Sequence, residues 1–138
     1  MAAFATRRLP RAPDAVAPDG SDVRALLALG GGSLAHFTLR PGRTSAAVRH
    51  RTVEEIWFVL SGRGEMWRAQ DGREEVVGLE AGVCLTIPVG TAFQFRATGK
   101  APLAIVAVTM PPWPGGGEAA PARGPWPASR RRAPDRRW

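Results

Sequence analysis

Between residues 25 and 110 the hydrophobic positions form short runs, which glycine, proline and polar residues separate. Side chains alternate along these runs, so that Phe37 and Leu39 lie on one face of their strand and His36 on the other. No run has the periodicity of an amphipathic helix, and Asp71-Gly72 predicts a hairpin turn. About nine such runs are typical of a sandwich or barrel, so the pattern predicts an all-β fold. The predicted strands cover residues 25–29, 33–40, 47–51, 55–60, 64–69, 76–79, 83–87, 92–96 and 103–110.

The pattern divides the chain into an amino-terminal arm at residues 1–24, a barrel at 25–110 and a tail at 111–138. The tail is rich in proline, glycine and arginine and has no apolar periodicity, a composition that is typical of disorder. The net charge is +7, and most of this excess lies in the tail. We therefore expect no nucleic-acid partner, except one that binds the tail through Arg130, Arg131, Arg132, Arg136 and Arg137, with Trp126 and Trp138 stacking on bases.

Composition also limits the cellular environments in which we expect the protein. Cys84 is the single cysteine, so neither a disulfide nor a thiolate metal site can hold the fold. Its apolar strand predicts that this cysteine is a small buried side chain. No apolar run approaches the roughly 20 residues of a membrane helix, and the amino terminus lacks the apolar segment of a signal peptide. We expect a cytoplasmic protein without a membrane partner.

Two blocks of residues have a defined spacing. The first block consists of Gly42, Val48, His50, Glu55 and Gly62. The second block consists of Gly82, Pro88, Gly90, Phe93 and Ala97. In this order and at these separations the blocks resemble the two motifs of the cupin superfamily, and the resemblance covers most of residues 25–110.

The resemblance implies a small single-domain cupin of the RmlC-like type. Such a protein is a conserved β-barrel, also described as a jelly roll or double-stranded β-helix, with its ligand or active site inside. Members of the superfamily usually bind a divalent metal there through three histidines and the glutamate. At the matching positions this chain retains His50 and Glu55, but Val48 and Phe93 replace two histidines. The resemblance therefore implies a degenerate metal site.

A stable metal site needs three or four donor groups that converge on one point. His50 and Glu55 supply two, so we expect no tightly bound metal. A metal-dependent enzyme of the dioxygenase, isomerase or lyase type stays open as an alternative. It would hold iron, manganese, nickel or zinc on His50, Glu55 and a further ligand that the sequence does not identify.

The same two residues also allow a function without metal. A carboxylate beside an imidazole can fix its tautomer and assist proton transfer. His50 and Glu55 are therefore candidate catalytic residues for the isomerisation, epimerisation or cyclisation of a small metabolite. The alternative is a module that binds a sugar-like or apolar small molecule without changing it. In either case the predicted pocket is lined by Val48, Trp57, Met66, Phe93 and Phe95.

Strand parity places several other residues. His36 and Gln94 point away from the barrel interior, whereas Arg68 points the same way as Met66 and is a candidate anchor for an anionic substrate. Residues 103–110 are apolar on both faces, so something besides the barrel must cover their outer face. A homodimer or the amino-terminal arm would provide this cover. Both interpretations stay open, and the resemblance favours the homodimer.

Overall fold

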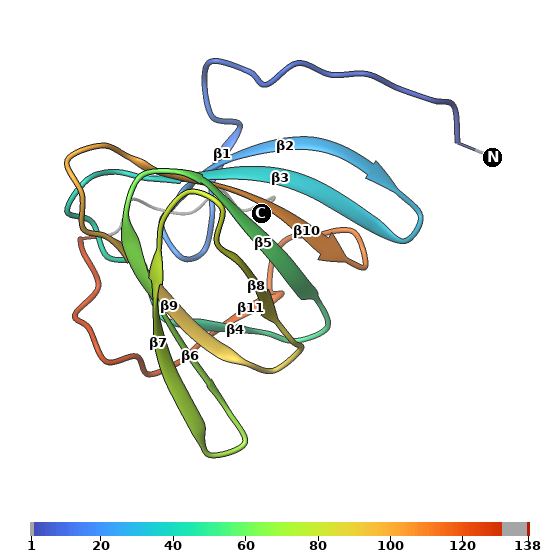
Figure 1. Ribbon diagram of the computed structural model, residues 1–138. Coiled ribbons are helices and arrows are strands. Elements are labelled where there is room, and N and C mark those ends of the chain that lie inside the picture. Colours follow the sequence, from blue (N-terminus) through green and yellow to red (C-terminus); the bar gives the residue numbers. More distant parts are fainter. Residues whose placement is uncertain (1, 131–137) are drawn as a thin grey trace.

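The computed structural model describes residues 2–130 and 138. Within these residues, eleven strands form two antiparallel sheets that enclose one core (Figure 1). The six-stranded sheet has the order β1 (Ala15–Val16), β2 (Asp22–Leu29), β3 (Gly32–Leu39), β10 (Leu103–Met110), β5 (Glu54–Ser61) and β8 (Cys84–Ile87). The five-stranded sheet has the order β11 (Ala119–Pro121), β4 (Val48–His50), β9 (Ala92–Ala97), β6 (Gly64–Gln70) and β7 (Arg73–Leu79).

Strands β2 to β10 confirm the nine strands that the hydrophobic pattern predicts. The hairpin turn between β6 and β7 lies at Asp71-Gly72 as expected, with φ angles of 49° and 79°. Positive φ at both central residues is the geometry of the tight turn that matches strand twist. The part of the chain that the structure describes contains no helix long and apolar enough to cross a membrane.

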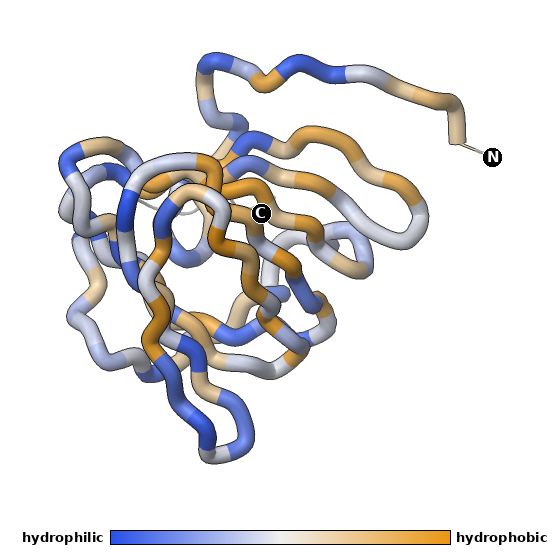
Figure 2. Tube along the Cα trace, viewed as in Figure 1, coloured by the Kyte–Doolittle hydropathy of each residue, from blue (hydrophilic) through white to orange (hydrophobic). Residues whose placement is uncertain are grey.

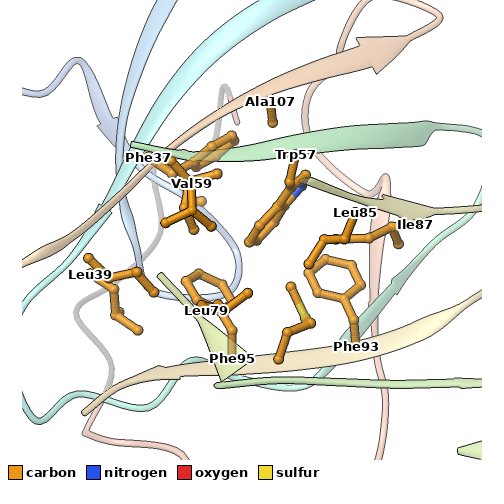
Figure 3. Packing of buried hydrophobic residues seen from close by; sticks show 14 of the residues in the cluster. Phe37, Leu39, Trp57, Val59, Leu79, Leu85, Ile87, Phe93, Phe95 and Ala107 are labelled. Atoms are coloured by element: carbon orange, nitrogen blue, oxygen red, sulfur yellow. The ribbon is translucent and has the colours of Figure 1, made fainter. Parts of the chain in front are cut away.

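Side chains from the two sheets meet in a core of aromatic and aliphatic residues (Figure 3). On β5, Trp57 points inward and is 2% exposed, whereas Ile56 and Phe58 point outward. The Trp57 ring stacks on Phe37 at 6.1 Å and meets Phe95 edge-on at 5.0 Å. Such ring pairs stabilise a core beyond the burial of their area. Trp57 therefore links the two sheets at the centre of the barrel.

The glycine that closes the first sequence block has a steric reason. Gly62 follows β5 directly and has a φ of 85°. A Cβ at this position would lie 2.4 Å from the carbonyl oxygen of Pro102. Both the dihedral angle and the close approach restrict the position to glycine. Gly62 thus allows the tight passage from β5 to β6.

The prediction of a disordered tail is wrong for part of residues 111–130. β11 pairs with β4 and becomes an edge of the five-stranded sheet. Further along, the Ser129 amide donates to the Thr44 carbonyl oxygen at 3.0 Å, and the Ser129 Oγ accepts from the Thr44 amide at 2.8 Å. Composition does not reveal such a segment, because its hydrogen bonds are made with distant parts of the chain. Residues 131–137 lie outside the described residues.

The six-stranded sheet also begins before the expected start of the barrel at residue 25. β1 lies in the segment that we expected to be an arm, and β2 begins at Asp22. The β1 strand pairs with β2, with Ala15 opposite Val23. Residues 2–13 contain no strand, but Arg7, Pro10 and Arg11 form hydrogen bonds with Arg24 and Ala25 of β2, and the chain before them projects past the sheets (Figure 1).

Cys84 is exposed, which corrects the expectation of a buried side chain. On β8, Leu85 and Ile87 point into the barrel, and Cys84 and Thr86 point outward. The parity of the strand, and not the apolar character of its neighbours, decides the position of the thiol.

His36 and Gln94 are both buried, although their strand parity directs them away from the barrel core. The terminal segments cover them. Gln94 donates from Nε2 to the carbonyl oxygen of Trp126 at 2.8 Å, and His36 lies beside Arg24, which binds the arm. The carboxyl-terminal segment therefore covers part of the outer face of the five-stranded sheet, and the amino-terminal arm is bound to Arg24 of the six-stranded sheet.

Candidate functional site

An internal cavity of about 20 Å³ lies between the two sheets. Five of the residues singled out from the sequence line it together: Val48, His50, Glu55, Trp57 and Phe93. The remaining lining comes from β3, from the loop after β1 and from the carboxyl-terminal segment, with Phe37, Ala17, Pro18, Asp19, Trp113, Ala119 and Trp138. The cavity is thus mostly apolar, with His50, Glu55 and Asp19 as its ionisable groups.

A buried carboxylate holds the turn between β4 and β5. Glu118 accepts hydrogen bonds from the backbone amides of Thr52 and Val53, each at 2.7 Å, and from Oγ1 of Thr52 at 2.9 Å. Burial alone would raise the pKa of Glu118, but these hydrogen bonds outweigh it and lower the pKa. The turn connects β4 of one sheet to β5 of the other, so His50 and Glu55 reach the cavity from different sheets.

The imidazole of His50 is packed between two aromatic rings. It meets Phe93 edge-on at 5.2 Å and Trp113 at 4.9 Å. Burial lowers the pKa of His50 to about 4, although the charge of Glu118 acts in the opposite direction. His50 is therefore neutral near pH 7. Its Nδ1 is buried and has no hydrogen-bond partner among the described residues, so this nitrogen is free to bind a ligand.

The carboxyl group of Glu55 is 4% exposed. Burial raises its pKa to about 8, the hydrogen bond from Trp57 lowers it, and the charge of Asp19 raises it further. The indole Nε1 of Trp57 donates this bond to Oε2 of Glu55 at 2.7 Å. Glu55 is therefore protonated near pH 7, and a protonated carboxyl can both donate and accept a hydrogen bond.

The donor groups present do not fit the metal that the superfamily usually binds. Val48 and Phe93 carry no donor atoms, and the described residues contain no group of three His, Cys, Asp or Glu side chains that could hold a metal ion. A cation on Glu55 would also have to displace the proton of the carboxyl group. Two donors do not offset the dehydration of a divalent ion.

Three other residues singled out from the sequence lie outside the cavity. Met66 and Phe95 are 0% and 1% exposed and pack in the core. Arg68 lines a separate hollow of about 140 Å³. Its guanidinium donates to the carbonyl oxygen of Thr86 at 2.8 Å and to Glu75 at 3.0 Å. Arg68 is thus not placed to anchor an anionic group in the cavity beside His50.

Sequence reasoning missed the residues that close the cavity from the two ends of the chain. Trp113 lies over His50, and its ring stacks at 5.8 Å on Trp138. Asp19 comes from the loop between β1 and β2. The one signal in the sequence was the presence of three tryptophans in a tail of mostly small and polar residues, of which we interpreted Trp126 and Trp138 as stacking groups for bases. The structure shows Trp138 in contact with Trp113, and Trp126 under the guanidinium of Arg96 at 4.1 Å.

Comparison with known proteins places the barrel in a family. The sequence profile described as Cupin domain matches residues 35–109. Over 72 residues, 52% of this chain, the sequence is 34% identical to the xanthan biosynthesis protein XanB of Xanthomonas campestris pv. campestris. The match spans 15% of that protein, so the chain corresponds to a small part of its relative.

Solved structures show a similar fold. A Bacillus halodurans protein is 22% identical with a TM-score of 0.61, over 70% of this chain and 73% of that one. A Klebsiella pneumoniae protein with a double-stranded β-helix domain is 22% identical with a TM-score of 0.58, over 66% and 72% of the two chains. Oxalate decarboxylase from Bacillus subtilis is 20% identical with a TM-score of 0.61, over 69% and 26%. The profile covers more than half of the chain and the fold agrees with it, so the protein belongs to the cupin-domain family.

Proposed function

We propose that this cupin barrel binds a small uncharged metabolite in the cavity between His50 and Glu55. The observation that carries the proposal is the unpaired Nδ1 of His50, a buried polar atom of a residue that lines the cavity. A buried nitrogen without a partner costs free energy, and a ligand hydroxyl or carbonyl can supply the missing hydrogen bond. The protonated carboxyl of Glu55 provides a second hydrogen-bonding group in the same space.

The charge state of the site favours an uncharged ligand. Burial keeps both His50 and Glu55 neutral near pH 7, and the charge of Asp19, the third ionisable group of the lining, is negative, so no group of the lining offsets the charge of an anionic ligand. Trp57, Phe93 and Val48 make the rest of the wall apolar. Bringing an ion into such an environment without a partner is costly. A sugar-like or carbonyl compound satisfies these conditions, and the similarity to a xanthan biosynthesis protein is in keeping with a carbohydrate-like ligand.

The carboxyl-terminal segment controls entry to this site. A cavity of about 20 Å³ accommodates one water molecule, and a metabolite needs more space. Trp113 and Trp138 belong to its lining and stack on each other, and neither lies in a strand, although the Trp113 ring also meets His50 of β4 edge-on at 4.9 Å. Displacement of these two indoles would enlarge the cavity without disturbing either sheet. We infer that the ligand enters where they lie.

Proton transfer is a second candidate function, and the charge state of the pair favours it. A neutral imidazole can accept a proton from the carbon beside a carbonyl group, while a protonated carboxyl can donate one to the carbonyl oxygen. The product is an enol. When the Glu55 carboxylate takes back the hydroxyl proton and the His50 imidazolium returns a proton to the carbon, the carbonyl compound is regenerated with that hydrogen exchanged. Burial shifts the pKa of His50 down and that of Glu55 up, which produces these two protonation states together.

A ligand-observed NMR screen tests the binding proposal. The probes are aldoses, their lactones, small cyclic ketones and, for comparison, small monocarboxylates. We expect saturation transfer to uncharged probes with the wild-type protein, stronger transfer with Trp113→Ala, and loss of transfer with Val48→Phe, which fills the cavity. Binding of none of the uncharged probes, even to Trp113→Ala, would overturn the proposal. Preferential binding of the carboxylates would overturn the uncharged class.

Hydrogen exchange in D₂O tests the catalytic candidate with the carbonyl probes that bind. Wild-type protein should speed the exchange of the hydrogen beside the carbonyl group, and both His50→Ala and Glu55→Gln should abolish this effect. Exchange that is no faster than in buffer, with a probe that binds, would show a binding module without this chemistry.

A further inference from the structure

A polar hollow lies outside the cavity, where the edge strands of the two sheets come together. Strand β7 ends the five-stranded sheet, and β8 ends the six-stranded sheet. Arg68 of β6 spans the two sheets, because its Nη1 donates to the carbonyl oxygen of Thr86 on β8 at 2.8 Å. The hollow has a volume of about 140 Å³, and among the described residues of its lining all except Pro88 are polar. It therefore differs from the mostly apolar cavity beside His50.

The hollow carries a net positive charge. Glu75 of β7 accepts one hydrogen bond from Arg68 and one from Arg73, each at 3.0 Å and each at a different carboxylate oxygen. Two guanidinium groups thus bind one carboxylate, which leaves one positive charge in this cluster. Figure 2 shows the polar character of this hairpin, since the tip between β6 and β7 is hydrophilic. A ligand with one negative charge would neutralise the cluster.

Both arginines keep N–H groups for a ligand. A guanidinium group has five N–H donors, and the hydrogen bonds to Thr86 and Glu75 use two of those of Arg68. The bond to Glu75 uses one of those of Arg73. The side chain of Arg68 is 21% exposed, and its two bonds hold it beside the hollow. A planar guanidinium can bind two oxygen atoms of one oxyanion side by side.

A buried hydroxyl without a partner belongs to the same lining. Thr91 comes from the loop between β8 and β9 and is 2% exposed. Its Oγ1 is buried and has no hydrogen-bond partner among the described residues. Such an unpaired hydroxyl costs free energy, and it can donate to an oxygen atom of a ligand. This observation does not depend on the charge of the arginines, yet it indicates a ligand in the same hollow.

We propose that this hollow binds a small oxyanion with one negative charge, either a monocarboxylate or dihydrogen phosphate. Arg68 and Arg73 bind its oxygen atoms, and the hydroxyl of Thr91 donates to one of them. One water molecule needs roughly 10 to 15 Å³ of such space, so a hollow of about 140 Å³ has room for an anion of a few heavy atoms. The site is separate from the cavity beside His50 and does not depend on the function proposed there.

An NMR titration of the ¹⁵N-labelled full chain tests the proposal. The probes are sodium acetate and sodium phosphate at pH 7, in a buffer without oxyanions and at constant ionic strength set with sodium chloride. We expect saturable shifts of the Thr86 and Thr91 amides and of the Arg68 side chain with at least one probe, and no such shifts with chloride alone. The probe that binds more tightly identifies the class of oxyanion.

Arg73→Gln removes one charged donor and should raise the dissociation constant roughly tenfold, the effect of losing one charge-assisted hydrogen bond. The matched control is Arg63→Gln, which removes the same charge from the chain. Both side chains are exposed, at 81% and 73%, and each pairs with one glutamate at 3.0 Å. Arg63 is not part of the lining, so its variant should bind the anion as wild type does. Equal weakening by the two variants would show a response to net charge and would overturn the proposal.

Thr91→Val replaces the unpaired hydroxyl with a methyl group of the same shape. Without the anion, urea denaturation should show that this variant is at least as stable as wild type, because a buried group without a partner is removed. The anion should bind roughly tenfold more weakly and should stabilise the variant less than it stabilises wild type. A variant that is less stable without the anion but binds it normally would show that the hydroxyl has a structural role only, and would refute its part in the site.

Val48→Phe separates this site from the cavity, which that substitution fills. Anion binding in the hollow should persist in Val48→Phe, and it then leaves the uncharged class proposed for the cavity untouched. A carboxylate signal that Val48→Phe abolishes would place the anion in the cavity and overturn the proposal for the hollow. The absence of saturable shifts with both probes at tens of millimolar would overturn it as well.

Discussion

The indole Nε1 of Trp57 donates a 2.7 Å hydrogen bond to Oε2 of Glu55, two residues earlier on the same strand. Both side chains point into the barrel and are at most 4% exposed. The bond directs a buried carboxyl group toward the cavity that it shares with His50. The position of the candidate acid is thus decided by its own strand, whereas its pKa is decided mainly by burial.

Removal of this bond should destabilise the protein and raise the pKa of Glu55 above about 8. Trp57→Phe keeps an aromatic ring in the core but loses the donor, at a cost of roughly 1 to 3 kcal/mol. The control is Trp67→Phe, because Trp67 donates a comparable 2.9 Å bond to Glu74 nearer the surface. Urea denaturation should show the larger loss for Trp57→Phe. Equal losses of unfolding free energy in the two variants would mean that burial does not strengthen the Trp57–Glu55 hydrogen bond.

Stability should fall as the pH rises through the pKa of Glu55. This pKa is raised from 4.5 to about 8 in the folded protein, so between these values the folded state binds one proton more than the unfolded state. The free energy of unfolding then decreases by roughly 1 kcal/mol per pH unit. At pH 6.5 half of the unfolded molecules still bind a proton on His50, so its opposing contribution ends only above about pH 7.5. Urea denaturation between pH 6.5 and 8 should therefore show a steeper fall of stability with pH in wild type than in Glu55→Gln.

His50 should produce the opposite slope at lower pH. Its pKa is lowered from 6.5 to about 4, so between these values the unfolded state binds the additional proton and stability rises with pH. In wild type the Glu55 slope opposes this one above pH 4.5, and the stability should be almost flat up to pH 6.5. Glu55→Gln should reveal the rise. The double variant with His50→Gln should lose most of it, and a remaining rise would belong to His36, whose pKa is also lowered by burial and by the charge of Arg24.

Trp113→Ala should open the cavity to solvent. Because His50 loses an aromatic neighbour at 4.9 Å, its pKa should increase from about 4 toward 6.5. Loss of the half-buried indole should also cost roughly 1 to 3 kcal/mol. An NMR titration of the imidazole measures the pKa. Trp126→Ala is the matched control, since Trp126 packs on Arg96 and should leave the pKa of His50 unchanged.

Glu118→Ala should loosen the turn between the two candidate site residues. The carboxylate accepts three hydrogen bonds of 2.7 to 2.9 Å from Thr52 and Val53, and their loss should cost roughly 2 to 4 kcal/mol. Hydrogen exchange of the Thr52 and Val53 amides should accelerate. Glu80→Ala, which removes an exposed ion pair with Arg63, should change stability by less than about 1 kcal/mol. If both amides exchange as slowly in Glu118→Ala as in wild type, Glu118 does not hold the turn.

The barrel was predictable from the sequence because its signals are local. Alternation along a strand assigns Phe37 and Leu39 to the core, and a turn that needs positive φ identifies Asp71-Gly72. Gly62 closes the first sequence block with a φ of 85°, a local backbone conformation that favours glycine. The spacing of that block also singled out His50 and Glu55, and both residues line one cavity in the structure.

The ends of the chain were not predictable, since their structure depends on distant partners. The segment around Glu118 has no periodicity, and it becomes ordered because a carboxylate, an edge strand and Trp113 each find a partner in the barrel. The same holds for Cys84, whose exposure depends on which face of β8 the fold turns outward.

The sequence by itself determined the all-β barrel, the strand order along the chain and the pair His50 and Glu55, because period-two patterning and turn geometry are encoded between near neighbours. Only the tertiary structure decided that both groups are neutral, that Trp113 closes their cavity and that the outer sheet face is left uncovered. Those properties depend on burial, and burial results from contacts between segments that lie far apart in the sequence.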